Sequence, residues 1–180
     1  MADTALPLTS LLLSDGVWRN SGQDREAGPA ALALSLLTPQ IPLIFDDAAR
    51  DVERAHFVQS ALAVRAKLIA PRLADCRPHD AHTLRAGGAG ESDALLASWS
   101  LADGEMLSIA LNLSPDPVVQ FEAPAGRVVF ETPGRARDRV DRGELPAYSL
   151  VAWLTGDVNH YALTHDVRRM DEGAWRGIHG

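Results

Sequence analysis

The chain has 180 residues and a formal net charge of −7, and 46% of its residues are hydrophobic. A net negative charge argues against nucleic acid and anionic membranes as partners, because both attract basic proteins. Cys76 is the single cysteine, so an internal disulfide is excluded. No apolar run approaches the roughly 18 residues that a membrane helix needs, and the N-terminal apolar run lacks a basic flank. We therefore expect a globular protein of about one domain in the cytoplasm.

The first part of the chain is expected to hold a loop, an apolar helix and a short strand. The polar residues 21–28 predict a loop. Residues 29–37 begin with proline and continue with alanine and leucine, which predicts a helix that requires burial on nearly every face. Residues 41–45 form a short apolar run typical of a buried strand, and Pro42 places this strand at an edge or a bulge.

A long helix is expected next, over residues 48–73. Apolar residues recur along one broad stripe of this segment, and charged residues lie on the other side. Asp46 or Asp47 is suited to cap its start, because a carboxylate accepts hydrogen bonds from the free N–H groups there. Pro71 is expected to end its regular part. The following residues, 75–94, are rich in proline, histidine and glycine and predict a loop.

The remaining pattern is that of strands. Short runs of β-forming residues lie at 96–101, 106–113, 118–121, 127–131 and 148–154. Asp103-Gly104 stands between two of these runs and predicts a tight hairpin turn, which needs a residue with positive φ. Short strands at intervals of roughly ten residues predict a small antiparallel sandwich or barrel.

Three segments resemble parts of one enzyme superfamily. Residues 32–45, Leu-Ala-Leu-Ser-Leu-Leu-Thr-Pro-Gln-Ile-Pro-Leu-Ile-Phe, resemble the last helix and strand of the catalytic barrel in the α-amylase superfamily, glycoside hydrolase family 13. Within it they look most like malto-oligosyltrehalose trehalohydrolase, an enzyme of trehalose biosynthesis. Residues 57–73 resemble the helix that leads out of that barrel. Residues 95–154 resemble the C-terminal β-domain, including a final apolar strand with Trp153.

The resemblance implies an α+β fold in which a helix and a strand remain from a (β/α) barrel, followed by a long exit helix and an all-β antiparallel sandwich. The resemblance divides the chain into five segments. They are a barrel remnant (residues 1–47), a connecting helix (48–74), a loop (75–94), the C-terminal β-domain (95–155) and an irregular tail (156–180). The family's catalytic carboxylates come from earlier barrel strands, and no stretch before Leu32 matches them. The resemblance therefore supplies no catalytic residue.

The length of the chain also argues against hydrolysis. A (β/α)8 barrel takes at least ~200 residues, and the exit helix is expected to begin before residue 50. Retaining glycosidases hold two carboxyl groups about 5–5.5 Å apart. Asp46 and Asp47 are adjacent in sequence, so their side chains diverge. We expect a truncated relative of the trehalose-forming hydrolase without activity of its own. The alternatives are a carbohydrate- or partner-binding β-sandwich module and a non-functional remnant.

Other polar clusters predict neither a cofactor nor a metal site. His160 and His165 are five residues apart and so do not share a helical face, which favours a solvated tail. Cys76 lies near His79 in the expected loop and is predicted to be an inert thiol. The glycine-rich residues 87–90 lack the lysine of a phosphate-binding loop and predict a linker. The arginines of residues 135–142 alternate with aspartates, as in an exposed loop.

Two features suggest binding sites: a tryptophan ring that could contact a sugar, and the apolar residues 29–45 that could contact a protein. Trp153 is expected in the core, whereas Trp99 is either a core residue or the one candidate for a sugar contact, since aromatic faces stack on sugar rings. The expected ligand is an α-glucan or a malto-oligosaccharide. Residues 29–45 are expected to mediate self-association or to bind a protein partner, because the rest of a barrel that would cover these apolar side chains is missing.

Overall fold

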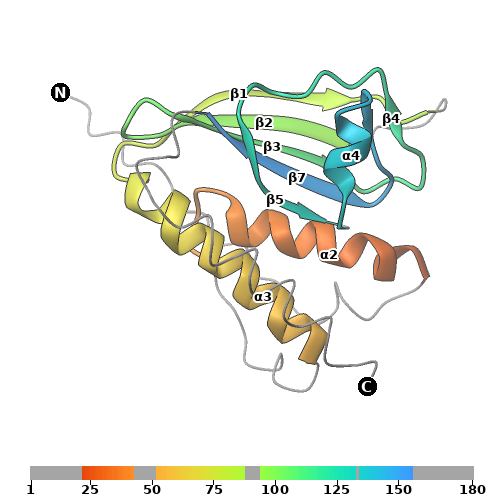
Figure 1. The fold of residues 1–180 in the computed structure, drawn as a ribbon, viewed down its shortest axis with the longest axis horizontal. Coiled ribbons are helices and arrows are strands. Elements are labelled where there is room, and N and C mark those ends of the chain that lie inside the picture. The colour runs from red at the N-terminus through yellow and green to blue at the C-terminus, as the bar shows by residue number, and fades with distance from the viewer. Residues whose placement is uncertain (1–21, 43–51, 88–93, 133, 156–180) are drawn as a thin grey trace.

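A computed structural model describes residues 22–42, 52–87, 94–132 and 134–155 of the chain (Figure 1). These residues form a five-stranded antiparallel sheet with two helices on one face. A two-stranded sheet and a short helix lie on the other face. Within these ranges no helix has the length and apolar character needed to cross a membrane. The predicted antiparallel, sheet-rich region is thereby confirmed, and its two sheets are consistent with the predicted sandwich.

The five-stranded sheet has the order β1-β2-β3-β7-β5, so the last strand in the sequence lies near its centre. The seven strands are β1 (Arg77–Leu84), β2 (Ala94–Ser100), β3 (Met106–Asn112), β4 (Val118–Val119), β5 (Arg127–Thr132), β6 (Glu144–Leu145) and β7 (Ser149–Leu154). β4 pairs with β6 in the small sheet. The predicted turn joins β2 to β3, and Gly104 has a φ of 83° there.

The loop predicted for residues 75–94 is wrong, because β1 (Arg77–Leu84) lies in that segment. β1 is an edge strand whose side chains are exposed on both faces except at Leu84, which is partly buried. A strand of this kind shows no alternation of polar and apolar residues, so the sequence gives no strand signal. The arginine-rich segment likewise holds a short helix, α4 (Ala136–Val140), which buries Ala136 and Val140 and exposes its arginines.

The apolar helix is longer than predicted. α2 (Gly22–Leu37) includes the polar residues expected to form a loop, and Pro29 lies inside it rather than at its start. α2 packs between the sheet and the next helix. It turns Ala30, Ala33 and Leu37 toward the sheet and Leu32 and Leu36 toward that helix. The apolar side chains of this helix, which we expected to lack cover from a missing barrel, are therefore buried within the chain.

The exit helix changes its geometry along its length. α3 (Val52–Val64) is followed by a π-helical turn (Arg65–Ile69) and a 3-10 turn (Ala70–Arg72), so the regular α-helix ends before Pro71. The wider turn helps to bury Ile69 in the core beside the sheet. Ile41 and Pro42 form no strand, while residues 43–47, with the predicted capping aspartates, lie outside the described residues.

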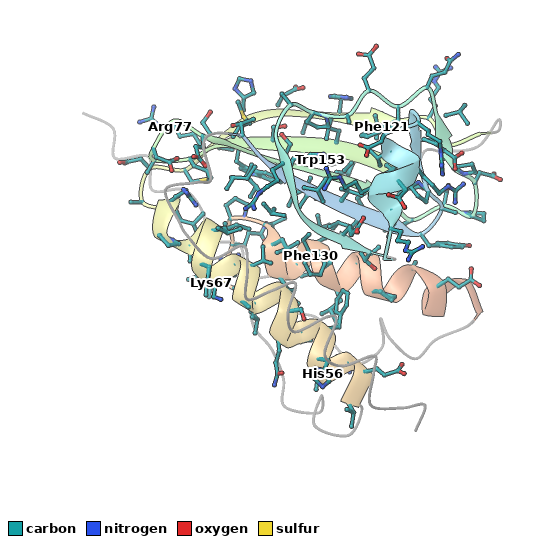
Figure 2. All side chains as sticks on the ribbon, in the orientation of Figure 1. His56, Lys67, Arg77, Phe121, Phe130 and Trp153 are labelled. Carbon is teal, nitrogen blue, oxygen red and sulfur yellow. The ribbon has the colours of Figure 1, made fainter. Side chains whose placement is uncertain are left out.

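Successive side chains of the central strands point to opposite faces of the sheet, so each face has its own hydrophobic core. Leu150, Ala152 and Leu154 of β7 face the helices, whereas Val151 and Trp153 face α4 and the small sheet. On that second face the Trp153 ring packs against Phe121, with ring centroids 6.1 Å apart (Figure 2). Both faces of the central strand are thus buried, which explains why its sequence is a continuous apolar run.

Candidate functional site

Polar side chains from β1, β2 and β3 lie next to one another on one side of the sheet. We call Asp80, His82, Ser98 and Ser108 the polar face. Asp80 lies opposite Ser98, and Ser98 lies opposite Ser108, so three neighbouring strands place these side chains on one side of the sheet. His82 is two residues from Asp80 and therefore points to the same side.

Two side-chain contacts organise the polar face. His82 Nδ1 lies 3.2 Å from Asp80 Oδ2, and the hydroxyl oxygens of Ser98 and Ser108 are 2.9 Å apart. The side chains of Asp80 and His82 are 64% and 51% exposed, so solvent weakens their attraction and leaves both free to bind other groups. Ser108 is buried and is paired with Trp153 of β7, where the polar face ends against the hydrophobic core.

This surface can form hydrogen bonds, but it lacks the chemistry of a glycosidase. Asp80 is the one carboxylate on β1, β2, β3 and β7. Glu131 on β5 accepts a hydrogen bond of 2.7 Å from the backbone N–H of Arg137, so its carboxylate is bound to the backbone of α4. Glycoside hydrolysis requires two carboxyl groups that flank the scissile bond. Among the described residues, no group of three or more histidine, cysteine, aspartate or glutamate side chains could hold a metal ion.

Trp99 lies on the opposite side of the sheet from the polar face. It is partly buried, pairs in register with Pro78 and Leu107, and packs against the core beneath the helices. The structure therefore does not bring this candidate for a sugar contact together with Asp80 and His82. Trp153 is 2% exposed and lies in the core, as predicted. His160 and His165 lie outside the described residues.

Cys76 lies just before β1 and is 6% exposed, within the same core as Ile69 and Leu101. Burial raises the pKa of the Cys76 thiol, because the charged thiolate loses its solvation there. His79 lies on β1 and is exposed. The thiol is therefore protonated and shielded, which agrees with an inert cysteine.

Two buried arginines hold the helices in place. Arg65 Nη1 donates hydrogen bonds to the carbonyl oxygens of Leu36, at 3.1 Å, and Thr38, at 2.6 Å, and Nη2 donates to the carbonyl of Gln40. These carbonyls lie at the C-terminal end of α2, where a helix leaves acceptors without partners and where a positive charge is favourable. Burial lowers the pKa of Arg65, whose ordinary value is so high that it keeps its charge.

Arg72 joins the exit helix to the β2–β3 turn. Its Nε donates to the carboxylate of Asp103, its Nη1 donates to the carbonyl of Leu68, and its Nη2 lies 3.7 Å from Glu105. The backbone N–H of Ala102 also donates to the carbonyl of Arg72, at 3.0 Å. The sequence holds a signal for both arginines, because they continue the helical spacing of buried residues along this segment. Their acceptors lie far away in sequence and could not be predicted.

Part of the β-domain is similar to a known family of domains. Residues 82–152 match a family model described as "Domain of unknown function (DUF3459)", a C-terminal domain found in α-amylase-family enzymes. This part of the chain is therefore similar to a C-terminal domain of α-amylase-family enzymes. The match begins within β1 and ends within β7, so it spans the sheet and its α4 cover. No curated protein and no solved structure matches the chain.

Proposed function

We propose that this chain is a relative of malto-oligosyltrehalose trehalohydrolase. It contains a C-terminal β-domain like that of the enzyme and does not hydrolyse glycosidic bonds by itself. The family match over residues 82–152 supports the origin of the β-domain. The resemblance of residues 32–45 and 57–73 to the end of the catalytic barrel and its exit helix supports the narrower family.

The proposed lack of catalysis rests on the small number of carboxylates on the described strands. Asp80 stands without a second acid on β1, β2, β3 and β7, and Glu131 accepts a hydrogen bond from Arg137. A retaining mechanism needs a nucleophile carboxylate and an acid/base carboxyl about 5–5.5 Å apart. The described sheet offers one exposed carboxylate beside an imidazole, which is suited to binding a hydroxyl group rather than to breaking an acetal.

Covalent trapping tests this proposal. A 5-fluoro-α-glucosyl fluoride leaves a slowly hydrolysed glycosyl ester on the nucleophile of a retaining α-glycosidase, and intact-mass spectrometry detects the added sugar. We expect the mass of the chain to stay unchanged, while an active α-amylase-family enzyme treated in parallel gains one glycosyl group. Stoichiometric labelling of the folded chain, lost on unfolding it beforehand, would contradict the proposal.

The second candidate function is α-glucan binding, and the polar face favours it. Its carboxylate, imidazole and hydroxyl groups match the donors and acceptors of sugar hydroxyls, and Asp80 and His82 are both more than half exposed. Trp99 is the alternative contact on the other side of the sheet. Electrophoresis through gels that contain amylopectin distinguishes the two positions.

We expect the wild-type chain to be retarded in these gels and Asp80→Ala to lose most of the retardation. Asp138→Ala is the matched control, because it removes an exposed aspartate from α4 instead. Loss of retardation in Trp99→Ala alone would place the sugar on the helix side of the sheet. Unchanged mobility of the wild type at high amylopectin concentration would remove this second function.

A further inference from the structure

Residues 118–121 and 135–148 lie over the face of the sheet opposite α2 and α3, and we call them the cover (Figure 1). They contain β4, α4 and β6, and they bury Trp153 of β7. Among the described residues β4 and β6 pair with each other and with no strand of the five-stranded sheet. The backbone N–H of Phe121 also donates to the carbonyl of Gly143, at 2.9 Å, within the cover. Apolar side chains, rather than a strand ladder, therefore hold the cover on the sheet.

One buried side chain fixes one end of the cover. Asn112, at the end of β3, is 0% exposed. Its Nδ2 donates hydrogen bonds to the carbonyls of Asp116 and Pro146, each at 2.9 Å. Asp116 comes just before β4, and Pro146 directly follows β6, so both connections of the small sheet meet at this amide. The fixed end of the cover therefore lies at Asn112.

Backbone strain is concentrated in the cover. Gln120, Arg135 and Tyr148 are the non-glycine residues with positive φ in the described part of the chain, at 56°, 71° and 50°. A residue with a Cβ seldom adopts this conformation, because the Cβ crowds the backbone, so each of them costs free energy in the folded state. Gln120 directly follows β4, Arg135 directly precedes α4, and both are exposed. Departure of the cover from the sheet would relieve this strain.

We propose that the cover opens as one unit about Asn112 while the five-stranded sheet and the helices stay folded, and that strain at Gln120 and Arg135 favours the opening. Strained residues persist only where the surrounding structure imposes them, and proteins open locally in cooperative units. Opening exposes the Trp153 ring, which packs against Phe121 when the cover is closed (Figure 2). This conformational device goes beyond the proposed function, because neither the family match nor the lack of catalysis requires it.

Two buried alanines on paired central strands report on the two faces of the sheet. Ala110 of β3 lies under the cover, Ala152 of β7 lies under the helices, and each is 0% exposed. In a Cys76→Ala background, Ala110→Cys and Ala152→Cys each give a chain with a single thiol. A disulfide reagent in solution reaches this thiol only when its face of the sheet opens. We expect Ala110→Cys to react about tenfold faster than Ala152→Cys, or more, and equal rates overturn the proposal.

Glycine substitutions test the role of the strain. Arg135→Gly, added to the Ala110→Cys chain, removes the strain from the closed state and should slow the reaction roughly fivefold. Arg142→Gly is the matched control, because it removes another exposed arginine of the cover from a position without positive φ. This control should not slow the reaction. An unchanged rate with Arg135→Gly, or equal slowing by Arg142→Gly, overturns the role of the strain.

Hydrogen exchange of the wild-type chain tests whether the cover moves as one unit, and it needs no variant that could fail to fold. We expect the amides of β4, α4 and β6 to lose protection together, at urea concentrations where β3 and β7 stay protected. Separate loss of protection in α4 and the small sheet would show that the cover is not one unit. Loss in the cover and in β3 at the same urea concentration would show that it does not open on its own. Either result overturns the proposal.

Discussion

At the residue scale, Arg65 shows how one buried side chain joins two elements. Its guanidinium is bonded to carbonyls at the end of α2, although the residue itself lies in the π-helical turn after α3. Removing it leaves buried acceptors without donors, and hydrogen bonds from charged groups contribute about 1.5–3 kcal/mol each.

We expect Arg65→Met, which keeps much of the side-chain volume, to lower the free energy of unfolding by about 2–4 kcal/mol in urea melts. Arg65→Lys should fall between this variant and the wild type, since an ammonium cannot reach all three carbonyls. Lys67→Met is the control on the same turn, where the side chain is exposed, and it should change stability by less than about 0.5 kcal/mol. Equal effects of the two methionine variants would contradict the capping role.

Cys76 gives a prediction about pH. Its pKa is raised by burial in the folded chain, so the unfolded chain, with a thiol pKa of about 8.5, releases the proton first. The stabilisation is complete below that pH and is lost as the pH rises toward the folded-state pKa. Urea melts from pH 7 to 10 should therefore show a steeper loss of stability for the wild type than for Cys76→Ala. Parallel curves for the two proteins would show that the thiol does not contribute.

At the element scale, the β2–β3 hairpin depends on a left-handed glycine. The Leu101 N–H donates to the Glu105 carbonyl at 2.8 Å, and Gly104, with a φ of 83°, closes the turn between them. A Cβ at Gly104 meets no atom within 4 Å, so the cost of a side chain is backbone strain alone.

Gly104→Val should therefore lower the free energy of unfolding by about 1 kcal/mol or more. Gly134 is the matched control, because a Cβ there also meets nothing within 4 Å but no positive φ is required. Gly134→Val should cost less than about 0.5 kcal/mol. If the two variants melt at the same urea concentration, the strain at the hairpin is not the cause.

The elements also show what sequence patterns can reveal. The strands that bury side chains, such as β3 and β7, could be predicted because burial requires apolar residues in a strand-like run. β1 could not, because its side chains are exposed on both faces and only backbone pairing with β2 makes it a strand. The first half of α2 was hidden by Gly28 and Pro29, both poor helix formers, whose cost is offset by packing of the helix against the sheet and α3.

The polar face was missed for the same reason as β1. Asp80 and His82 lie on the strand that the pattern did not predict, and Ser98 and Ser108 come together through pairing between β2 and β3. Trp99 could be proposed as a sugar contact from its residue type. Its placement across the sheet from the polar face depends on the register between strands, which the sequence alone does not provide.

At the scale of the whole molecule, the helices and the β-domain share one core. Ala33 of α2 and Ile69 of the exit helix belong to the same buried cluster as Ile109 and Leu150 of the sheet. A fragment that begins at Asp75 exposes that face, and each large apolar side chain left in water forgoes roughly 1.5–3 kcal/mol. We expect such a fragment to bind a hydrophobic dye and to lack a cooperative urea transition. A sharp transition without dye binding would show that the β-domain folds independently.

Self-association through residues 29–45 stays a prediction, although its basis is narrower than the sequence indicated. The helical residues of this segment are mostly buried, and Ile41 is its exposed large apolar side chain in the described range, at 54%. Ile41→Ser should weaken self-association through this segment, which sedimentation velocity across micromolar concentrations measures. A wild type that stays monomeric, or an Ile41→Ser variant that associates as the wild type does, would contradict this prediction.

The central proposal is that this chain does not hydrolyse glycosidic bonds by itself, and trehalose release from malto-oligosyltrehalose tests it most directly. The account predicts no trehalose above a blank without protein, even at high protein concentration and long incubation, and the same result for Asp80→Asn. Release that persists through repeated purification, rises in proportion to the chain and falls in a carboxylate variant would contradict the account.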